Sequence, residues 1–274
     1  MSRIQSILEK AERDGAVRRV QTIDQAGTPA RAFEVPRPIT PRHEDSAHPT
    51  PEARPARSVR STGLDRNLVA VLAPGAPAAE QYRALRTRVA HADHGRPLNV
   101  ILVTSPGRRE GKSLTAANLA LTMAQNFQSR ICIVDADLRH SSLHTLFGVE
   151  ESLGLADVLV GKTVLADALV GLDDQQIAML PAGARPLHPA ELLGSTAMRR
   201  TIDTLRTQFD RVIIDAPAAG PLADVGILAP LVDGVVLVVQ AGVTTKPAIQ
   251  EAVTTIGAAK FLGVVLNDMV AAGS

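Results

Sequence analysis

The sequence predicts an α/β protein built on a doubly wound, mostly parallel sheet. Short runs rich in valine, isoleucine and leucine alternate with longer segments whose apolar residues recur at helical spacing. Nearly every position in the short runs is apolar, which is typical of parallel strands covered by helices on both faces. A Gly-Lys-Ser sequence at residues 111–113 follows one such run and opens a helix, so the same segment also carries a phosphate-binding signature.

The chain divides into three parts by composition. Residues 1–15 predict an amphipathic helix that needs a docking surface, with a frayed chain end as the alternative. Residues 16–63 predict a flexible, disordered linker, because seven of the 18 prolines fall there among charged and small residues. Residues 64–274 are expected to form the phosphate-binding domain.

The elements of that domain follow from apolar spacing. A helix is expected at residues 78–92, where Tyr82, Leu85 and Val89 share one face. Short β-branched runs predict strands at residues 99–104, 130–134, 177–180, 211–214, 234–240 and 263–267. Helical patterns between them, at residues 112–126, 190–209, 222–230 and 247–258, supply the right-handed crossovers that parallel strands need.

Composition excludes several classes of function. With 29 Lys and Arg against 28 Asp and Glu, and 2% aromatic residues, the chain offers neither a basic face nor stacking platforms, so no nucleic-acid partner is expected. Its single cysteine, Cys132, lies in an apolar run and is better explained as a buried hydrophobe than as a reactive thiol. No apolar stretch is long enough to span a membrane and no apolar leader is visible, so a cytoplasmic location is expected.

The segment 105–113 predicts a loop that binds phosphate. Lys112 is expected to reach the β- and γ-phosphates of a nucleotide, Ser113 to ligate Mg²⁺, and Gly111 to allow close backbone approach. The strict motif has glycine where this chain has Pro106, and a coincidental helix start is the alternative. The expected nucleotide-binding residues are Gly107, Arg108, Arg109, Glu110, Gly111, Lys112, Ser113 and Leu114.

Acidic residues follow two of the predicted strands. Asp135 and Asp137 end the strand at 130–134, with Arg139 two residues further on, and Asp215 ends the strand at 211–214. Ligands of open α/β sheets bind at this edge, and a strand-terminal Asp often holds Mg²⁺ in proteins with such a loop. Each carboxylate alone could instead be a solvated strand end or a helix cap. Together they predict a metal–nucleotide site.

These three motifs resemble the Walker A, A′ and B motifs of the bacterial tyrosine kinases of capsule and exopolysaccharide assembly. That family shares its fold with the MinD/ParA ATPases, and the similarity covers residues 78–267. Further matching stretches are Leu180-Pro181-Ala182-Gly183, Pro189-Ala190-Glu191-Leu192-Leu193, Val232-Asp233-Gly234, Gly242-Val243-Thr244-Thr245-Lys246 and Gly263-Val264-Val265-Leu266-Asn267.

The resemblance implies ATP and Mg²⁺ as cofactors and a role for each residue. Ser113, Asp137 and Asp215 would hold the metal, and Asp135 or Asp137 would accept the proton of the attacking hydroxyl. Arg139 would stabilise charge or contact the acceptor. The catalytic set is Lys112, Asp135, Asp137, Arg139 and Asp215. Asn267 would contact adenine, or serve simply as a turn residue.

The resemblance also implies a ring-shaped homo-oligomer. Its Glu-x-x-Arg-x-x-Arg assembly motif matches Glu80, Arg83 and Arg86, which share one face of the helix at 78–92. Pairing between neighbouring turns of a solvated helix is the alternative explanation.

The chain departs from the family pattern at three places. Arg108-Arg109 stands where the family has Pro-Gly, so Arg109 is expected to lose the left-handed conformation that glycine adopts easily. Ala218 replaces a second proline after Asp215. The family's tyrosine-rich C-terminal tail is absent from the sequence, in which Tyr82 is the single tyrosine.

Three functions remain open from the sequence. The first is a tyrosine kinase whose acceptor lies on another protein, activated by a separate transmembrane partner of the chain-length-determinant type that brings it to the inner face of the plasma membrane. The second is a regulatory ATPase of polysaccharide export, and the third is a nucleotide-binding scaffold without turnover. DNA partitioning and septum positioning are less attractive, because no basic face and no C-terminal amphipathic helix are visible.

Overall fold

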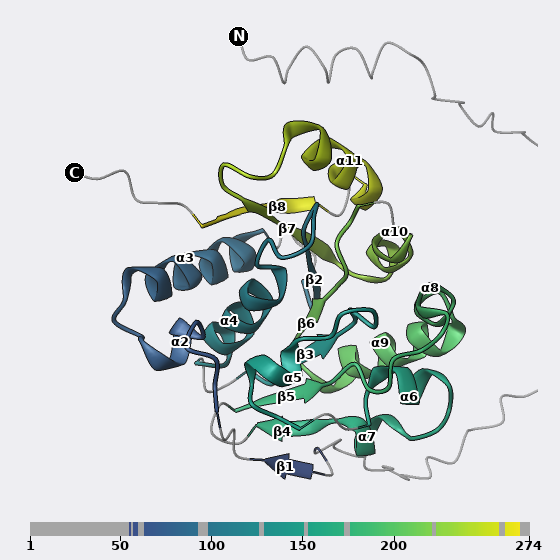
Figure 1. The fold of residues 1–274 in the computed structure, drawn as a ribbon. Helices are drawn as coiled ribbons and strands as arrows, with labels where there is room; N and C mark the ends of the chain where they lie inside the picture. Colours follow the sequence, from purple (N-terminus) through teal and green to yellow (C-terminus); the bar gives the residue numbers. More distant parts are fainter. Residues whose placement is uncertain are drawn as a thin grey trace, which may run out of the picture. The chain divides into compact units, whose positions relative to one another are not determined.

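An eight-stranded sheet forms the centre of the protein in the computed structural model (Figure 1). The structure describes residues 55, 57–59, 63–92, 98–125, 129–150, 153–172, 176–220, 223–257 and 261–268. The helix expected at residues 1–15 and most of the expected linker at 16–63 lie outside the described residues. The strands are β1 (Arg57–Val59), β2 (Val100–Thr104), β3 (Ile131–Asp135), β4 (Val170–Leu172), β5 (Ile177–Leu180), β6 (Arg211–Asp215), β7 (Gly234–Gln240) and β8 (Phe261–Asn267).

The strand order is β1-β4-β5-β3-β6-β2-β7-β8. Every neighbouring pair runs parallel except β4 and β5, which are antiparallel. Strand β2 therefore lies between β6 and β7, and β3 lies on the far side of β6. The predicted fold class is confirmed, and the carboxyl ends of β2, β3 and β6 are brought to one edge of the sheet.

Alternation along each central strand divides the core into two layers. In β2, Val100 and Leu102 belong to one apolar cluster, and Ile101 and Val103 belong to the other. All five residues of β2 are buried, which agrees with a strand covered on both faces.

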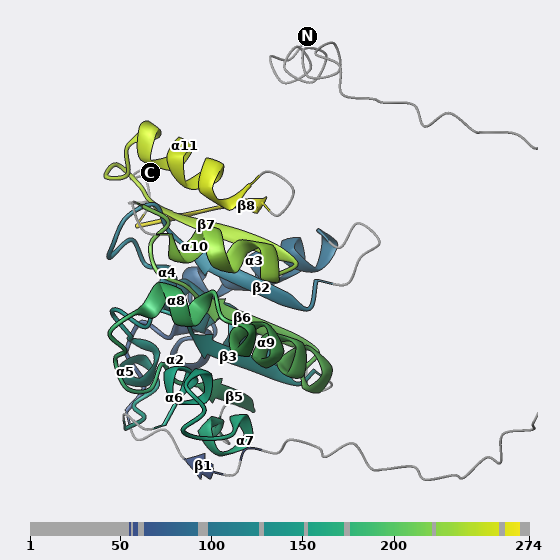
Figure 2. The ribbon, with the colours of Figure 1, turned by 90° about the vertical axis from the view of Figure 1, so that its right-hand side faces the viewer.

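Helices cover both faces of the sheet (Figures 1 and 2). One face carries α2 (Val69–Leu72), α3 (Pro77–His91), α4 (Lys112–Ala124) and α5 (Leu143–Leu146). The other carries α6 (Leu155–Leu159), α7 (Leu165–Ala168), α8 (Pro189–Leu193), α9 (Thr196–Gln208), α10 (Asp224–Leu228), the 3₁₀ turn η2 (Ala229–Leu231) and α11 (Lys246–Ile256). Within the described part of the chain, no helix has both the length and the apolar character needed to cross a membrane.

The single helix expected at residues 190–209 is wrong, because two helices occupy this range. Helix α8 ends at Gly194, and Ser195 begins α9 by accepting a hydrogen bond from the Met198 N–H at 3.2 Å. A serine in this position satisfies a free N–H of the first helical turn and favours a new helix start.

Two short strands extend the sheet beyond the prediction. Strand β1 pairs with β4 and lies inside the range 16–63 that was expected to be linker, so the folded part begins earlier than residue 64. Strand β4 contains Gly171 at its centre. Three-residue strands are too short to show a periodic pattern in the sequence, which is why neither was predicted.

Candidate functional site

The loop between β2 and α4 has the shape of a phosphate cradle. Gly111 has φ 92° and immediately precedes Lys112, the first residue of α4. Arg109 has φ 63°, so the expectation that it would lose the left-handed conformation is wrong. The loop keeps the conformation suited to glycine at this position and accepts the strain of an L-residue there, on the order of 1 kcal/mol or more.

Lys112 connects the loop to both acidic strand ends. Its Nζ lies 2.9 Å from Asp137 Oδ2 and 3.5 Å from Asp215 Oδ1, and donates to Ser113 Oγ at 3.1 Å. Burial alone would lower the pKa of Lys112, but Asp215, Asp137 and Asp135 raise it above its ordinary value. Lys112 is therefore held charged at the point where a phosphate would bind, and the predicted convergence of these side chains is found in the structure.

Asp135 anchors the backbone that follows β3. Its Oδ1 accepts the N–H of Asp137 at 3.2 Å, and its Oδ2 accepts those of Ser142 and Leu143 at 3.0 and 3.1 Å. Burial raises the pKa of Asp135 to about 6 in spite of these donors. Both oxygens are thus used inside the protein, which gives Asp135 a structural role in shaping the site.

Asp137 faces Lys112 more directly. Its Oδ1 accepts the N–H of His140 at 2.9 Å, while its Oδ2 contacts the Lys112 ammonium. Burial would raise the pKa of Asp137, but Lys112 and the His140 N–H lower it below its ordinary value. Asp137 is therefore ionised at neutral pH.

Asp215 is a buried carboxylate without a hydrogen bond. Its side chain is 0% exposed, and neither oxygen has a hydrogen-bond partner among the described residues. Burial raises the pKa of Asp215 to about 7, while the Lys112 ammonium and the nearby Ser113 hydroxyl favour its charged form. Such a group needs a cation or ordered water to satisfy it.

The donor set fits magnesium. Two carboxylates and the Ser113 hydroxyl are the hard oxygen ligands that Mg²⁺ prefers, and Mg²⁺ in nucleotide sites keeps several waters and phosphate oxygens. Within the described residues, no group of three or more His, Cys, Asp or Glu side chains is placed to hold a metal alone. The metal would consequently depend on the nucleotide for part of its shell.

Glu110 connects the cradle to the loop that follows the neighbouring strand β7. Its Oε2 accepts the Gly107 N–H at 3.0 Å, and its Oε1 accepts the Thr244 hydroxyl at 2.6 Å. Thr244 belongs to the loop between β7 and α11, and its hydroxyl also accepts the Gln240 N–H at 3.0 Å. The loop conformation thus depends on a residue 134 positions away in the sequence.

Asn267 lies directly over the cradle. Its Nδ2 donates to the Glu110 carbonyl at 3.1 Å, and a Cβ added to Gly111 would come within 2.2 Å of the same nitrogen. Gly111 is therefore required for space as well as for its φ angle. Asn267 is more than a turn residue, since it holds the loop; its predicted adenine contact stays a prediction.

A cavity of about 360 Å³ opens beside the cradle. Its lining residues are Arg109, Gly111, Lys112, Ser113, Leu114, Ser142, Thr145 and Leu146. Arg108 and Arg109 are exposed, and Arg109 reaches the rim of this cavity. Five of the expected nucleotide residues therefore border one hollow, whereas Gly107, Arg108, Glu110 and Asn267 are not among its lining residues.

Arg139 is bound to a residue that the sequence did not single out. Its Nε and Nη2 donate to the two oxygens of Asp224, at 2.7 and 3.1 Å, and Asp224 is fully buried at the start of α10. The predicted catalytic role of Arg139 stays a prediction, and the structure adds Asp224 as its partner.

The predicted assembly residues divide between two roles. Glu80 and Arg83 form an ion pair at 2.7 Å on the outer face of α3, which is the alternative explanation given for them. Arg86 donates to the Thr122 carbonyl of α4 at 2.9 Å. Arg86 therefore helps to hold α3 against α4, and the predicted oligomer contact stays a prediction for Glu80, Arg83 and Arg86.

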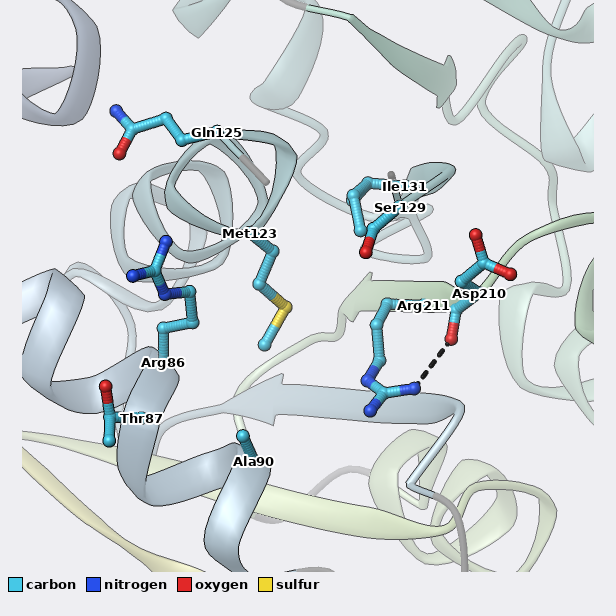
Figure 3. A pocket seen from close by; sticks show the side chains of 9 residues that line it. All are labelled: Arg86, Thr87, Ala90, Met123, Gln125, Ser129, Ile131, Asp210 and Arg211. Carbon is cyan, nitrogen blue, oxygen red and sulfur yellow. Dashed lines mark hydrogen bonds between the residues drawn. The ribbon is translucent and has the colours of Figure 1, made fainter. Parts of the chain in front are cut away.

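A second cavity lies at the opposite edge of the sheet. It measures about 540 Å³ and is bordered by Arg86 of α3, Met123 of α4 and the first residues of β3 and β6 (Figure 3). Arg211 in its wall donates to the Asp210 carbonyl at 2.9 Å. None of the predicted catalytic residues lines this cavity, so the larger hollow is separate from the nucleotide site.

Relatives of known kind match most of the chain. The tyrosine-protein kinase YwqD of Bacillus subtilis is 35% identical over 213 residues, which cover 77% of this chain and 90% of YwqD. The chain belongs to the bacterial tyrosine kinases. The predicted membership in the kinases of capsule and exopolysaccharide assembly is thereby confirmed. A search against models of protein families found no match for this kinase.

Several solved structures share the fold of this kinase. The chimerical protein CapA2B2 is 30% identical with a TM-score of 0.71, and the match covers 78% of this kinase and 93% of that chain. The kinase domain of the Escherichia coli tyrosine kinase ETK is 27% identical with a TM-score of 0.69, and covers 76% and 83% of the two chains. MinD of Pyrococcus horikoshii, solved with Mg-ADP, shares the fold at 23% identity and a TM-score of 0.52 over 61% of this kinase and 69% of MinD.

Two contacts of the predicted site residues were not expected from the sequence. Thr244 and Asp224 contact the predicted site from 134 and 85 residues away, respectively. Thr244 lies in a stretch that resembles the family, and Asp224 lies at the start of a predicted helix. Neither position in the sequence indicates which residue the side chain contacts. The three-dimensional pairing was the missing information.

Proposed function

We propose that this kinase transfers the γ-phosphoryl group of ATP to a tyrosine of another protein in polysaccharide assembly. The observation that carries the proposal is the contact of Lys112 with Asp137 and Asp215 at the mouth of the phosphate cradle. A cation from the loop and carboxylates from two strands meet there, as phosphoryl transfer requires.

The cradle would hold the nucleotide. Backbone N–H groups of residues 108–113 and the start of α4 would bind the phosphates, with Lys112 on the β- and γ-phosphates. Ser113, Asp137 and Asp215 would hold Mg²⁺, which supplies charge neutralisation to the transferred group. MinD, whose structure contains Mg-ADP, supports this reading through its shared fold.

Asp137 is the better candidate for accepting the tyrosine proton. Both oxygens of Asp135 accept backbone N–H groups, whereas Asp137 Oδ2 contacts only the Lys112 ammonium among the described residues. In the transfer, the bond from the γ-phosphorus to ADP breaks and a bond to the tyrosine oxygen forms. The tyrosine proton passes to Asp137.

The acceptor is proposed to lie on another protein. Tyr82 is the single tyrosine of the sequence, and it lies partly buried on α3 beside Thr115 and Asn118 of α4. Burial raises the pKa of Tyr82 above its ordinary value, which disfavours it as a nucleophile. A transmembrane activator of the chain-length-determinant type would supply the acceptor or present it, and would bring the kinase to the membrane.

We also propose a homo-oligomer assembled through α3. Glu80 and Arg83 project from the outer face of this helix, and the Glu80 side chain is 69% exposed. The pair lies at the surface, so Glu80 can exchange it for a contact with a second copy at little cost, while Arg83 also donates to the Pro74 carbonyl at 2.6 Å.

The experiment is phosphoamino-acid analysis with radiolabelled ATP and Mg²⁺. We expect phosphotyrosine on the cytoplasmic segment of the activator and none on the kinase itself. Lys112→Met should reduce the label roughly 100-fold or more, because it removes the cation that contacts the phosphates. Thr254→Val, which removes a hydroxyl on the exposed side of α11, is the matched control. Absence of phosphotyrosine on every component would contradict the kinase proposal.

One observation favours a regulatory ATPase as the second candidate. Both oxygens of Asp224 accept hydrogen bonds from Arg139. The Arg139 side chain is therefore held in place and is not free to swing toward an acceptor protein, which a kinase would have to bind and an ATPase would not. Release of inorganic phosphate without any phosphotyrosine, abolished by Lys112→Met, would select the ATPase.

A further inference from the structure

Asp224 and Arg139 form a partly buried, two-point ion pair at the edge of the site. The Arg139 Nε donates to Asp224 Oδ2 at 2.7 Å, and its Nη2 donates to Oδ1 at 3.1 Å. The Asp224 side chain is 0% exposed and that of Arg139 is 27% exposed. Two parallel hydrogen bonds between planar groups fix the direction of the guanidinium, which a single bond would not do.

The pair joins the two segments that carry the metal-site carboxylates. Arg139 comes two residues after Asp137, and Asp224 comes nine residues after Asp215. The same two segments are also joined at the ends of β3 and β6, where the Ala136 N–H donates to the Asp215 carbonyl at 2.8 Å. The segments that follow β3 and β6 are therefore connected twice, first beside the metal-site residues and again by the ion pair further along the chain.

Stability is a weak explanation for this pair. Moving two charges out of water costs about as much as their attraction returns, and apolar residues often replace a buried pair without loss. The pair is better explained by what it positions. An arginine has five N–H donors, and Asp224 takes two of those of Arg139. Among the described residues, no other hydrogen bond is seen from this guanidinium, and part of it remains exposed.

The remaining donors of Arg139 suit an oxyanion. Asp137 lies close enough to raise the pKa of Arg139 together with Asp224, so the guanidinium lies near the carboxylate that faces Lys112. An oxyanion at this place is either the phosphoryl group in transit or an acidic side chain of the acceptor protein.

We propose that Asp224 is a positioning residue, which holds Arg139 so that its free N–H donors contact an oxyanion at the phosphoryl-transfer site. The inference rests on the proposed function, because it requires a nucleotide in the cradle. It assigns to α10 a part in the site that no motif of the sequence indicated.

The test compares wild type with Asp224→Asn and Arg139→Lys. Asp224→Asn keeps the shape of the side chain but loses the charge and one acceptor, and Arg139→Lys keeps the charge but loses the planar fork. Asp157→Asn is the matched control, since Asp157 is also buried and paired, with Lys162 at 2.8 Å, away from the cradle. Urea unfolding of all four proteins shows that the comparison is made on folded material.

The first readout is calorimetric affinity for Mg·ADP and for Mg·ADP with aluminium fluoride, a mimic of the transferred phosphoryl group. If the oxyanion is the phosphoryl group, Asp224→Asn and Arg139→Lys should bind the mimic roughly tenfold or more weakly, with Mg·ADP affinity unchanged. If the oxyanion belongs to the acceptor, affinity for the mimic stays normal. The KM for the activator's cytoplasmic segment then rises at constant Mg·ADP affinity.

Some outcomes would overturn the inference. Unchanged affinity for the mimic together with unchanged KM and kcat would show that the pair positions nothing. Losses no larger than those of Asp157→Asn would show the same. If wild type fails to bind Mg·ADP at all, both the proposed function and this inference are wrong. If wild type binds Mg·ADP normally and the Asp224→Asn and Arg139→Lys variants behave like wild type, only this inference is wrong.

Discussion

At the scale of single residues, the site depends on charges held at unusual pKa values. Asp215 is the extreme case, because it is buried without a hydrogen bond and its pKa is raised to about 7, from an ordinary value near 3.8. In the protein without nucleotide, this carboxylate is a source of instability that a metal would relieve. The site is thus prepared for a cation before it binds one.

The pKa of Asp215 gives a pH prediction for stability. The folded state keeps the Asp215 proton to a higher pH than the unfolded chain does, so ionisation of Asp215 lowers the free energy of unfolding as pH rises from about 4 to about 7. Asp215→Asn removes this effect. We expect the variant to gain stability over wild type as pH rises, by at most about 4 kcal/mol above pH 7.

Urea unfolding at pH 5, 6, 7 and 8 measures this difference. The gain should be small at pH 5 and largest at pH 8, in protein free of Mg²⁺ and nucleotide. A gain that is equal at all four values would contradict the raised pKa of Asp215.

The residues that the sequence predicted well are those fixed by strand direction. Asp135, Asp137 and Asp215 had to meet at one edge, because parallel strands bring their carboxyl ends together. Asp224 and Thr244 could not be predicted in the same way. Each contacts its partner through packing of elements that are distant in the sequence, and no periodic pattern encodes such a pairing.

At the scale of elements, the loop between β7 and α11 supports the phosphate cradle. The Thr244 hydroxyl donates to Glu110 Oε1 at 2.6 Å, and Glu110 in turn accepts the Gly107 N–H. The Glu110 side chain is buried, so loss of this donor would leave one carboxylate oxygen without a partner.

Thr244→Val tests this support. We expect a loss of about 1–3 kcal/mol in the free energy of unfolding, together with weaker Mg·ADP binding, because the cradle loses a fixed point. Urea unfolding and calorimetry measure the two effects. Thr255→Val, which removes a hydroxyl bonded only to its own helix, should change neither. Normal nucleotide affinity in Thr244→Val would show that the loop does not support the cradle.

Element boundaries followed the sequence where apolar runs were long. The strands at 177–180 and 234–240 were predicted to the residue: an apolar run lies between Gln176 and Pro181 in the first and between Gly234 and Gln240 in the second. Failures fell on the three-residue strands β1 and β4 and on the short helices α2, α5, α6 and α7. The packing of the whole sheet, rather than local pattern, decides whether such short segments are ordered.

At the scale of the whole molecule, the strand order explains why one edge carries the chemistry. Strand β2 ends in the cradle, and its neighbour β6 and next neighbour β3 end in carboxylates. The larger cavity lies at the other edge, where the strands begin and none of these residues is present (Figure 3). Sequence reasoning reached this arrangement because fold class and motif placement supported each other.

The central claim is that the cradle around Lys112 binds a nucleotide together with magnesium held beside Asp215. Calorimetric titration of ADP with and without Mg²⁺, in wild type and in Asp215→Asn, tests it most directly. We predict that Mg²⁺ tightens ADP binding to wild type by about tenfold or more, equivalent to about 1.4 kcal/mol, and that Asp215→Asn loses most of this gain. Equal affinity of wild type with and without Mg²⁺, or no binding of ADP, would contradict the account.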